Sequence, residues 1–170
     1  MDKILRIDMG AEGGPKINSE GLGDYAGLAG RGITSAIISK EVPPSCHPLG
    51  KSNKIVIAPG LLSGSAAAQS GRISVGCKSP LTGGIKETNS GGQAAQVLGR
   101  LGYAAVILEG KPADDSLYKI VINKDGATIV PDNSLKKLGN YSLIDKMKDE
   151  FGEKVACISK IGRASCRERV

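Results

Sequence analysis

The sequence has few aromatic side chains and no long apolar run. It contains no Trp, one Phe and four Tyr among 170 residues. A membrane-spanning helix needs about 20 consecutive apolar residues, and no run here approaches that length, so we expect no membrane contact. The N-terminus leads into alternating charged and apolar residues, which argues against a secretory signal peptide. Nucleic-acid binding is also disfavoured, because the cations are scattered and no aromatic platform is available for base stacking.

Cysteines are also sparse, and their spacing does not form a metal-binding motif. Cys46, Cys77 and Cys157 make no C-x-x-C pair, and Cys166 lies close to the C-terminus. A zinc ribbon or a disulfide framework needs closely patterned cysteines. Cys46 and His47 are adjacent, but one Cys and one His do not make a site, and the prolines around them indicate a loop. We therefore expect free thiols in a reducing cytoplasm.

Glycine, by contrast, is in excess. It accounts for 24 of the 170 residues, about twice an ordinary share of about 7%. Glycine allows backbone conformations and close approaches that other residues resist. Because 40% of the residues are hydrophobic and 24% are charged, the chain can still bury a core. The composition therefore predicts one folded domain with a loop-rich site, and not a helical bundle or coiled coil.

Much of the excess positive charge lies in the last ten residues. Residues 161–170 read IGRASCRERV, and their back-translation matches one reading frame of a common short-read sequencing adapter. Without the three arginines and one glutamate of this stretch, 20 basic and 16 acidic residues remain, and the net charge falls from +6 to +4. We expect a domain over residues 1–160, the front part of a longer protein, followed by a non-native tail at 161–170. The alternative is a genuine basic arm.

Hydrophobic periodicity predicts a mixture of strands and helices. Strands are expected over residues 3–9, 54–58, 71–78, 104–109, 117–123, 127–130 and 154–158. Helices are expected over about 33–40, 94–101 and 142–151. Lys124-Asp125-Gly126 predicts a hairpin turn, and residues 85–90 are expected to form a loop. Since strands and helices do not alternate regularly, the predicted class is α+β with largely antiparallel or mixed sheets.

The strand at 71–78 offers one candidate binding surface. Its polar face carries Arg72, Ser74, Gly76 and Lys78. A flat anionic ligand could lie on the two small residues, with Arg72 and Lys78 holding its charges. The alternative is an exposed face whose cations are merely solvated.

A second candidate is Asn89-Ser90-Gly91-Gly92, which the pattern places at a helix start, with Ser90 and Gln93 as a capping box. Free N–H groups and the helix dipole attract phosphate there, although ordinary capping explains the residues as well. No G-x-G-x-x-G follows a strand and no P-loop occurs. The residues alone therefore predict a Gly-rich anion site in an α+β domain.

Eight stretches, collinear over residues 3–158, carry a family resemblance: KILRID at 3–8, AGRG at 29–32, EVPPSCHPLGKSNKIVIAPG at 41–60, SGR at 70–72, KSPLTGGI at 78–85, NSGG at 89–92, LGYAAVILEGKP at 101–112 and EKVACI at 153–158. Together they resemble the N-terminal domain of the tungsten-containing aldehyde ferredoxin oxidoreductase family. Two departures are mild: Leu61-Leu62-Ser63 stands where the family usually has Pro-Leu-Thr, and Ala29 replaces the first glycine of a GGRG stretch.

The resemblance implies a cytoplasmic enzyme that oxidises an aldehyde with water to a carboxylic acid and passes electrons through a [4Fe–4S] cluster to ferredoxin. It also implies two β-sheets that hold a tungsten (or molybdenum) bis-pterin, with a magnesium ion joining the pterin phosphates. Matched to the family motifs, Arg72 would contact the pterin, Asn89 would supply a magnesium ligand and Gly91 would let the backbone approach the cofactor. Lys78, Ser90 and Gly92 complete the expected cofactor-binding set.

No catalytic residue is expected in this chain, because the family's cluster cysteines and acid–base residues lie downstream of the matched region. The fragment alone should therefore be inactive. The competing hypothesis is a stand-alone phosphate- or anion-binding module without catalysis. The sequence does not identify the particular aldehyde. It also leaves the oligomeric state open, and a homo-oligomer is one of the alternatives.

Overall fold

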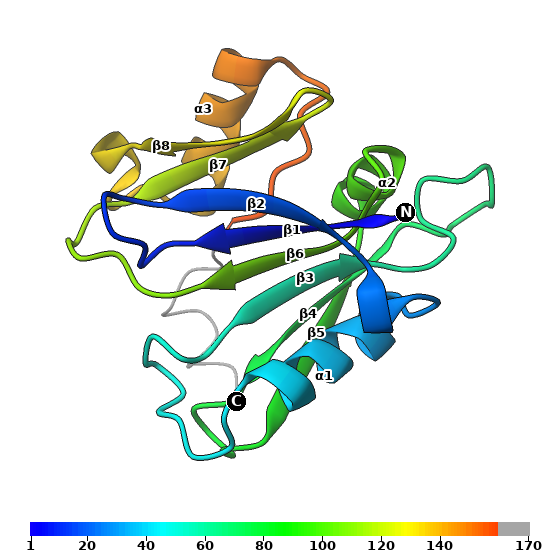
Figure 1. Cartoon of the computed structure of the whole chain (residues 1–170). Helices are drawn as coiled ribbons and strands as arrows, with labels where there is room; N and C mark the ends of the chain where they lie inside the picture. The colour runs from blue at the N-terminus through cyan, green and yellow to red at the C-terminus, as the bar shows by residue number, and fades with distance from the viewer. Residues whose placement is uncertain (160–170) are drawn as a thin grey trace. The chain divides into compact units, whose positions relative to one another are not determined.

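A computed structural model describes residues 1–159, so the tail expected at 161–170 lies outside the described residues. Six strands form one mixed sheet in the order β2-β1-β6-β3-β4-β5 (Figure 1). Their bounds are β1 Lys3–Asp8, β2 Lys16–Gly21, β3 Ile55–Pro59, β4 Arg72–Lys78, β5 Ile85–Gly91 and β6 Tyr103–Glu109. β1 and β6 run parallel, and every other neighbouring pair is antiparallel.

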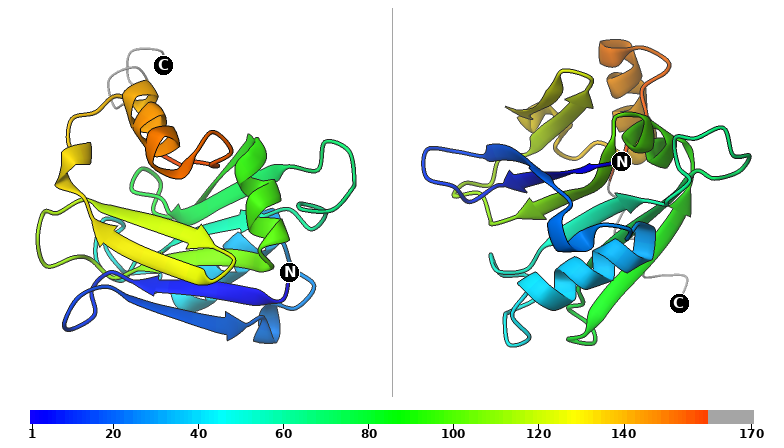
Figure 2. Two further views of the ribbon diagram at one scale, coloured as in Figure 1. Left: turned by 90° about the horizontal axis from the view of Figure 1, so that it is seen from above. Right: turned by 45° about the vertical axis from the view of Figure 1, so that its right-hand side comes forward.

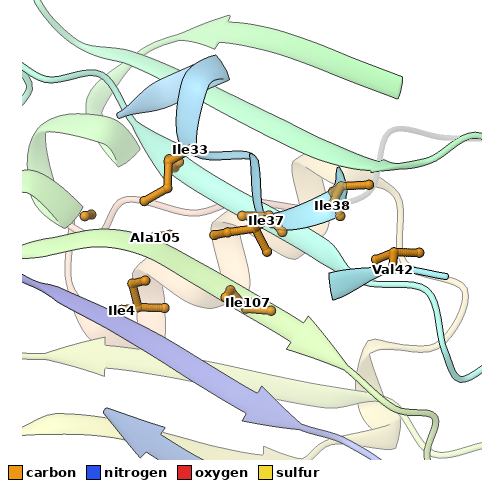
Figure 3. Close-up of a cluster of buried hydrophobic side chains, with 10 residues drawn as sticks. Ile4, Ile33, Ile37, Ile38, Val42, Ala105 and Ile107 are labelled. Carbon is orange, nitrogen blue, oxygen red and sulfur yellow. The ribbon is translucent and has the colours of Figure 1, made fainter. Parts of the chain in front are cut away.

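Both faces of this sheet carry apolar side chains. Successive residues of a strand point to opposite faces, and the neighbours Ile4 and Leu5 are both almost fully buried. On one face, helix α1 (Gly30–Glu41) inserts Ile33 and Ile37 against Ile4 and the strand residues around it (Figure 3). Because side chains pack against both faces of the sheet, the sequence of the central strand β6 is a nearly continuous apolar run.

The other face is covered by helix α2 (Gln93–Arg100) and a β-hairpin. α2 contributes Ala95 and Leu98 to a cluster with Leu5. The hairpin consists of β7 (Tyr118–Asn123) and β8 (Gly126–Pro131), and apolar residues such as Ile120 and Ile129 pack against the same cluster. The two helices therefore lie on opposite faces of the sheet (Figure 2). α1 lies along β4 and β5 on the face that carries Ile4, and α2 lies on the face that carries Leu5.

The chain divides into two compact units: Met1–Asp115 with Ile120–Ile129, and Ser116–Lys119 with the chain from Val130 onward. The second unit holds helix α3 (Asn140–Phe151), whose Met147 is buried. The Lys119 ammonium donates to both carboxylate oxygens of Glu150 at 2.6 and 2.7 Å. No helix in the described part of the chain is long and apolar enough to cross a membrane.

The structure confirms the α+β class and most of the predicted elements, and it corrects three expectations. Residues 85–90 are not a loop but belong to β5, an edge strand with little apolar alternation because most of its side chains are exposed. β2 was not expected, for the same reason. The strand expected over 154–158 is absent, since that stretch pairs with no strand within residues 1–159. Residues 1–159 form two sheets, the number expected, although the second is only the hairpin.

Candidate functional site

Antiparallel pairing of β4 with β5 brings the two candidate segments together. Arg72 lies directly opposite Gly91, and Ser74 lies directly opposite Asn89. Residues directly opposite in an antiparallel pair project to the same face. The Arg72 Nη1 atom is 3.9 Å from the position that a Cβ on Gly91 would occupy. The guanidinium and the glycine-bearing end of β5 therefore share one surface.

The N-cap of the helix is Gly92, two residues after the Ser90 that the predicted capping box implies. Asn89, Ser90 and Gly91 belong to strand β5, and Gly92 is the N-cap of α2 with φ 130°. The predicted capping box is wrong, because α2 has no side-chain cap hydrogen bond and the Ser90 hydroxyl donates to the Gly91 carbonyl at 3.1 Å. Gly92 takes the cap position since its φ lies in a region that residues with a Cβ rarely adopt. The segment thus offers strand side chains as well as a helix terminus.

The proposed flat platform of Ser74 and Gly76 is also wrong. Both residues are buried, because α1 lies across this part of β4. A Cβ on Gly76 would sit 2.8 Å from the Thr34 Cβ, closer than real Cβ atoms approach. The small side chains therefore serve the close approach of the helix and offer no surface to a ligand.

The two cations of β4 differ in their environment. Lys78 is 7% exposed, and its ammonium donates to the backbone carbonyls of Cys46 (2.8 Å) and Pro44. It lies at the opposite end of the strand from Arg72, about 20 Å away along the backbone. These contacts anchor the Pro-rich loop and favour a structural role, and the assignment of Lys78 to a cofactor stays a prediction.

Arg72, in contrast, is exposed, and no group within residues 1–159 accepts a hydrogen bond from its guanidinium. It lies near the N-terminus of α1, where Ala29 is the N-cap and provides no side-chain cap. Gly30 has φ 50°, and a Cβ there would sit 3.6 Å from both the Gly60 Cα and the Ser74 Oγ. A Cβ on Gly60 would in turn sit 4.0 Å from the Arg72 Cβ, so the start of α1 lies near the base of the Arg72 side chain. A cation close to the positive end of a helix dipole favours an anionic ligand.

Asn89 is held by a hydrogen-bonded group that sequence reasoning did not find. Its Oδ1 accepts from the Ser74 hydroxyl at 2.7 Å, and its Nδ2 donates to Glu87 Oε2 at 3.0 Å. Glu87 in turn accepts from Arg31 Nε at 3.0 Å and from the Thr34 hydroxyl at 3.4 Å. The sequence signal was present: once 85–91 is treated as a strand, Glu87, Asn89 and Gly91 alternate onto one face.

A separate hollow of about 800 Å³ lies elsewhere in the first unit and includes Glu41, Lys54 and Glu109 in its lining. The Arg6 guanidinium donates to Glu41 at 2.9 Å and to Glu109 at 3.1 Å, and Lys54 also contacts both carboxylates. Burial alone would raise the pKa of Glu41, but hydrogen bonds from Arg6, Lys54 and Tyr25 lower it to about 2. These four charged side chains satisfy one another and form a structural ion network along this part of the hollow.

Tyr25 belongs to the same network. Its hydroxyl donates to Glu41 Oε1 at 2.8 Å. Burial and this bond to a carboxylate raise the pKa of Tyr25 to about 12.

The described residues contain no group of three or more His, Cys, Asp or Glu side chains that could hold a metal ion. Within residues 1–159, the surface of Arg72, Asn89 and Gly91 combines a guanidinium without a hydrogen-bond partner, an exposed amide and an open glycine, which makes it the candidate ligand site.

Comparison with known proteins places the chain in a family. The family model "Aldehyde ferredoxin oxidoreductase, N-terminal domain" matches residues 4–168. The chain belongs to this family. The match reaches residue 168 and so includes most of the stretch expected to be a non-native tail, whose origin stays a prediction.

Curated relatives of the chain are tungsten-containing aldehyde ferredoxin oxidoreductases. The protein from Pyrococcus horikoshii is 38% identical over 167 residues, which cover 95% of this chain and 26% of the relative. The protein from Pyrococcus furiosus is 44% identical over 91 residues, which cover 54% of this chain and 15% of the relative. The chain thus spans about a quarter of the length of the first of these relatives.

A solved structure has the same fold. It is described as the active site complex BamBC of benzoyl coenzyme A reductase in complex with 1,5 dienoyl-CoA. The TM-score is 0.79 at 28% sequence identity, and the alignment covers 90% of this chain and 23% of the other. The fold expected from the family resemblance is therefore confirmed.

Proposed function

We propose that this chain is the N-terminal, cofactor-binding part of an aldehyde ferredoxin oxidoreductase. The complete cytoplasmic enzyme converts an aldehyde and water into a carboxylic acid, two protons and two electrons, and ferredoxin accepts the electrons. The [4Fe–4S] cluster ligands and the acid–base residues belong to downstream sequence, so the chain alone is inactive. Family membership together with the free Arg72 guanidinium beside Gly91 carries this proposal.

The residues present fit a metal–pterin cofactor. Arg72 offers a planar fork that can hydrogen-bond a pterin edge or a phosphate in two places. Gly91 leaves space for close backbone approach, and the Asn89 carbonyl oxygen is a ligand type that magnesium accepts. Ser90 and Gly92 flank this position on β5 and at the α2 N-cap. When bound, the tungsten or molybdenum centre supplies the two-electron redox chemistry, while these residues hold and orient it.

The test is tungsten content in the full-length protein purified from cells grown with tungstate. Arg72→Ala removes a charged hydrogen-bond donor worth about 1.5–3 kcal/mol, so tungsten per protomer should fall clearly. Arg100→Ala is the matched control, since Arg100 is an exposed arginine at the end of α2. Equal tungsten content in the two variants would reject the site.

The competing proposal is a stand-alone anion-binding module, which the free arginine near a helix N-terminus supports equally well. Sequencing the source transcript beyond codon 160 separates the two. A reading frame that continues to a C-x-x-C-x-x-x-C set supports the oxidoreductase, whereas a natural stop codon supports the module. Greater similarity to aldehyde oxidoreductases, at 38% identity, than to the benzoyl coenzyme A reductase complex, at 28%, favours an aldehyde as substrate.

A further inference from the structure

The Asn89 side chain can present either of two chemically opposite atoms to a ligand. Its amide oxygen can bind a cation, whereas its amide nitrogen can only donate hydrogen bonds. The two ends of the group have nearly the same shape, so neighbouring groups decide which one faces outward. Asn89 is exposed on edge strand β5, where solvent alone would not select between them.

One neighbour, Glu87, selects the orientation, and a second, Ser74, holds the selected orientation. The Glu87 carboxylate can only accept hydrogen bonds when ionised, so the amide nitrogen must lie toward Glu87 Oε2, 3.0 Å away. The Ser74 hydroxyl donates to the amide oxygen at 2.7 Å from the opposite strand. One lone pair of that oxygen remains available, because a carbonyl oxygen can accept twice.

Glu87 is itself held in place. Its side chain is only 13% exposed, and it accepts from Arg31 Nε at 3.0 Å and from the Thr34 hydroxyl at 3.4 Å, both on α1. Ser74 is 3% exposed and lies under the same helix. The orientation of Asn89 is thus set by side chains that the packing of α1 on β4 and β5 immobilises.

We propose that Glu87 and Ser74 are positioning residues that turn the Asn89 carbonyl oxygen toward a bound magnesium ion. This inference rests on the proposed function, which gives Asn89 a cation to bind. Glu87 does not contact the ion and acts only through the amide. Residues that orient a metal ligand in this way commonly change metal affinity by about 10- to 100-fold when removed.

The test measures magnesium and tungsten per protomer, and magnesium affinity, in full-length variants. Glu87→Ala should lower magnesium affinity by about 10-fold. Glu87→Gln keeps an oxygen that can accept from Asn89, so it should retain most of the affinity. Arg31→Ala is the comparison variant: it removes one of the two α1 contacts that hold Glu87 but leaves the Thr34 contact and the hydrogen bond to Asn89, so it should lose clearly less affinity than Glu87→Ala. A loss in Arg31→Ala equal to that in Glu87→Ala would show that the cluster is only a structural tie and would overturn the inference.

An Asn89→Asp background gives the sharpest comparison. Both terminal atoms of that side chain are oxygens, so its orientation no longer matters. Adding Glu87→Ala in this background should cause no further loss of magnesium. A full 10-fold loss there would mean that Glu87 acts by some route other than orienting an amide, and the inference would be wrong.

A metal-free measurement separates this inference from the proposed function. In the spectrum of the metal-free ¹⁵N-labelled chain, the Asn89 side-chain NH₂ pair should show one strongly hydrogen-bonded proton that Glu87→Ala abolishes and Arg31→Ala retains. If the unsubstituted full-length protein binds neither tungsten nor magnesium, the proposed function fails. The NH₂ signals then still decide whether Glu87 orients Asn89, and unchanged signals in Glu87→Ala would reject the orientation itself.

Discussion

The Arg72 guanidinium and the open Cα of Gly91 face each other across the β4–β5 pair, with 3.9 Å between Nη1 and the point where a Gly91 side chain would begin. This relationship requires both strands. The two residues are far apart in sequence, and only the antiparallel register makes them neighbours. It also defines where added bulk would interfere with a ligand.

Gly91→Val should obstruct the proposed cofactor site without unfolding the domain. The φ of Gly91 lies outside the left-handed region, and the position is exposed, so a strand-favouring side chain should be tolerated there. Tungsten per protomer of the full-length protein should fall, while the denaturant midpoint stays close to that of the parent. Gly21→Val, at the end of edge strand β2, is the control and should keep its metal. Normal tungsten in both variants would contradict the placement of the site.

Gly76→Ala should destabilise the domain. Its new methyl group would lie 2.8 Å from the Thr34 Cβ, so α1 or β4 must shift. Overpacking of this kind costs about 1–3 kcal/mol in free energy of unfolding. Urea denaturation measures the loss, and Gly21→Ala serves as the matched exposed change. A cost no larger than that of the control would show that the helix and strand are not tightly packed at this point.

Lys78→Met should weaken folding more than cofactor binding. The substitution keeps an apolar stem but removes the donor to the Pro44 and Cys46 carbonyls. Leaving a buried polar group unpaired costs about 1–3 kcal/mol, so the midpoint of unfolding should fall. Tungsten content of the protein that remains folded should stay near normal. Loss of tungsten without loss of stability would instead support the original assignment of Lys78 to the cofactor.

Acid should weaken the domain through Glu41. Its pKa is lowered to about 2 in the folded chain from an ordinary 4.5, so the folded state holds the ionised carboxylate more favourably than the unfolded state does. This contribution is fully present above about pH 4.5 and is lost as the pH falls toward 2. The free energy of unfolding, measured by urea titration across this range, should decline, and Glu41→Gln should flatten the decline. An unchanged slope in that variant would show that Glu41 is not linked to acid unfolding.

Burial decided which elements could be predicted from sequence. Helix α1 and strand β4 were predicted because their buried side chains recur at helical or strand spacing. Strand β5 was not predicted, because most of its side chains are exposed and an edge strand of this kind needs no alternation of apolar and polar residues. The polar face of β4 was identified but misinterpreted, since only the tertiary structure shows that α1 covers Ser74 and Gly76.

The candidate site was predictable only in part, for a related reason. Arg72 was predicted from the polar face of its strand, and Asn89 and Gly91 from a Gly-rich segment; the family motifs then gave them roles, and the structure brings them onto one face. Glu87 has no motif of its own. Its relation to Asn89 depends on strand geometry in a segment that was expected to be a loop, and its relation to Arg31 depends on the docking of α1.

The docking of α1 beside β4 and β5 has a consequence for the order of assembly. Arg31 lies on α1, Ser74 on β4, and Glu87 and Gly91 on β5, so no short peptide contains the arrangement. Closing those loops must precede any gain from a shared ligand. Binding of the proposed cofactor therefore requires that the β3–β4–β5 meander has paired and that the helix has packed on it. A chain that is synthesised only through β4 still lacks β5 and cannot present the proposed site.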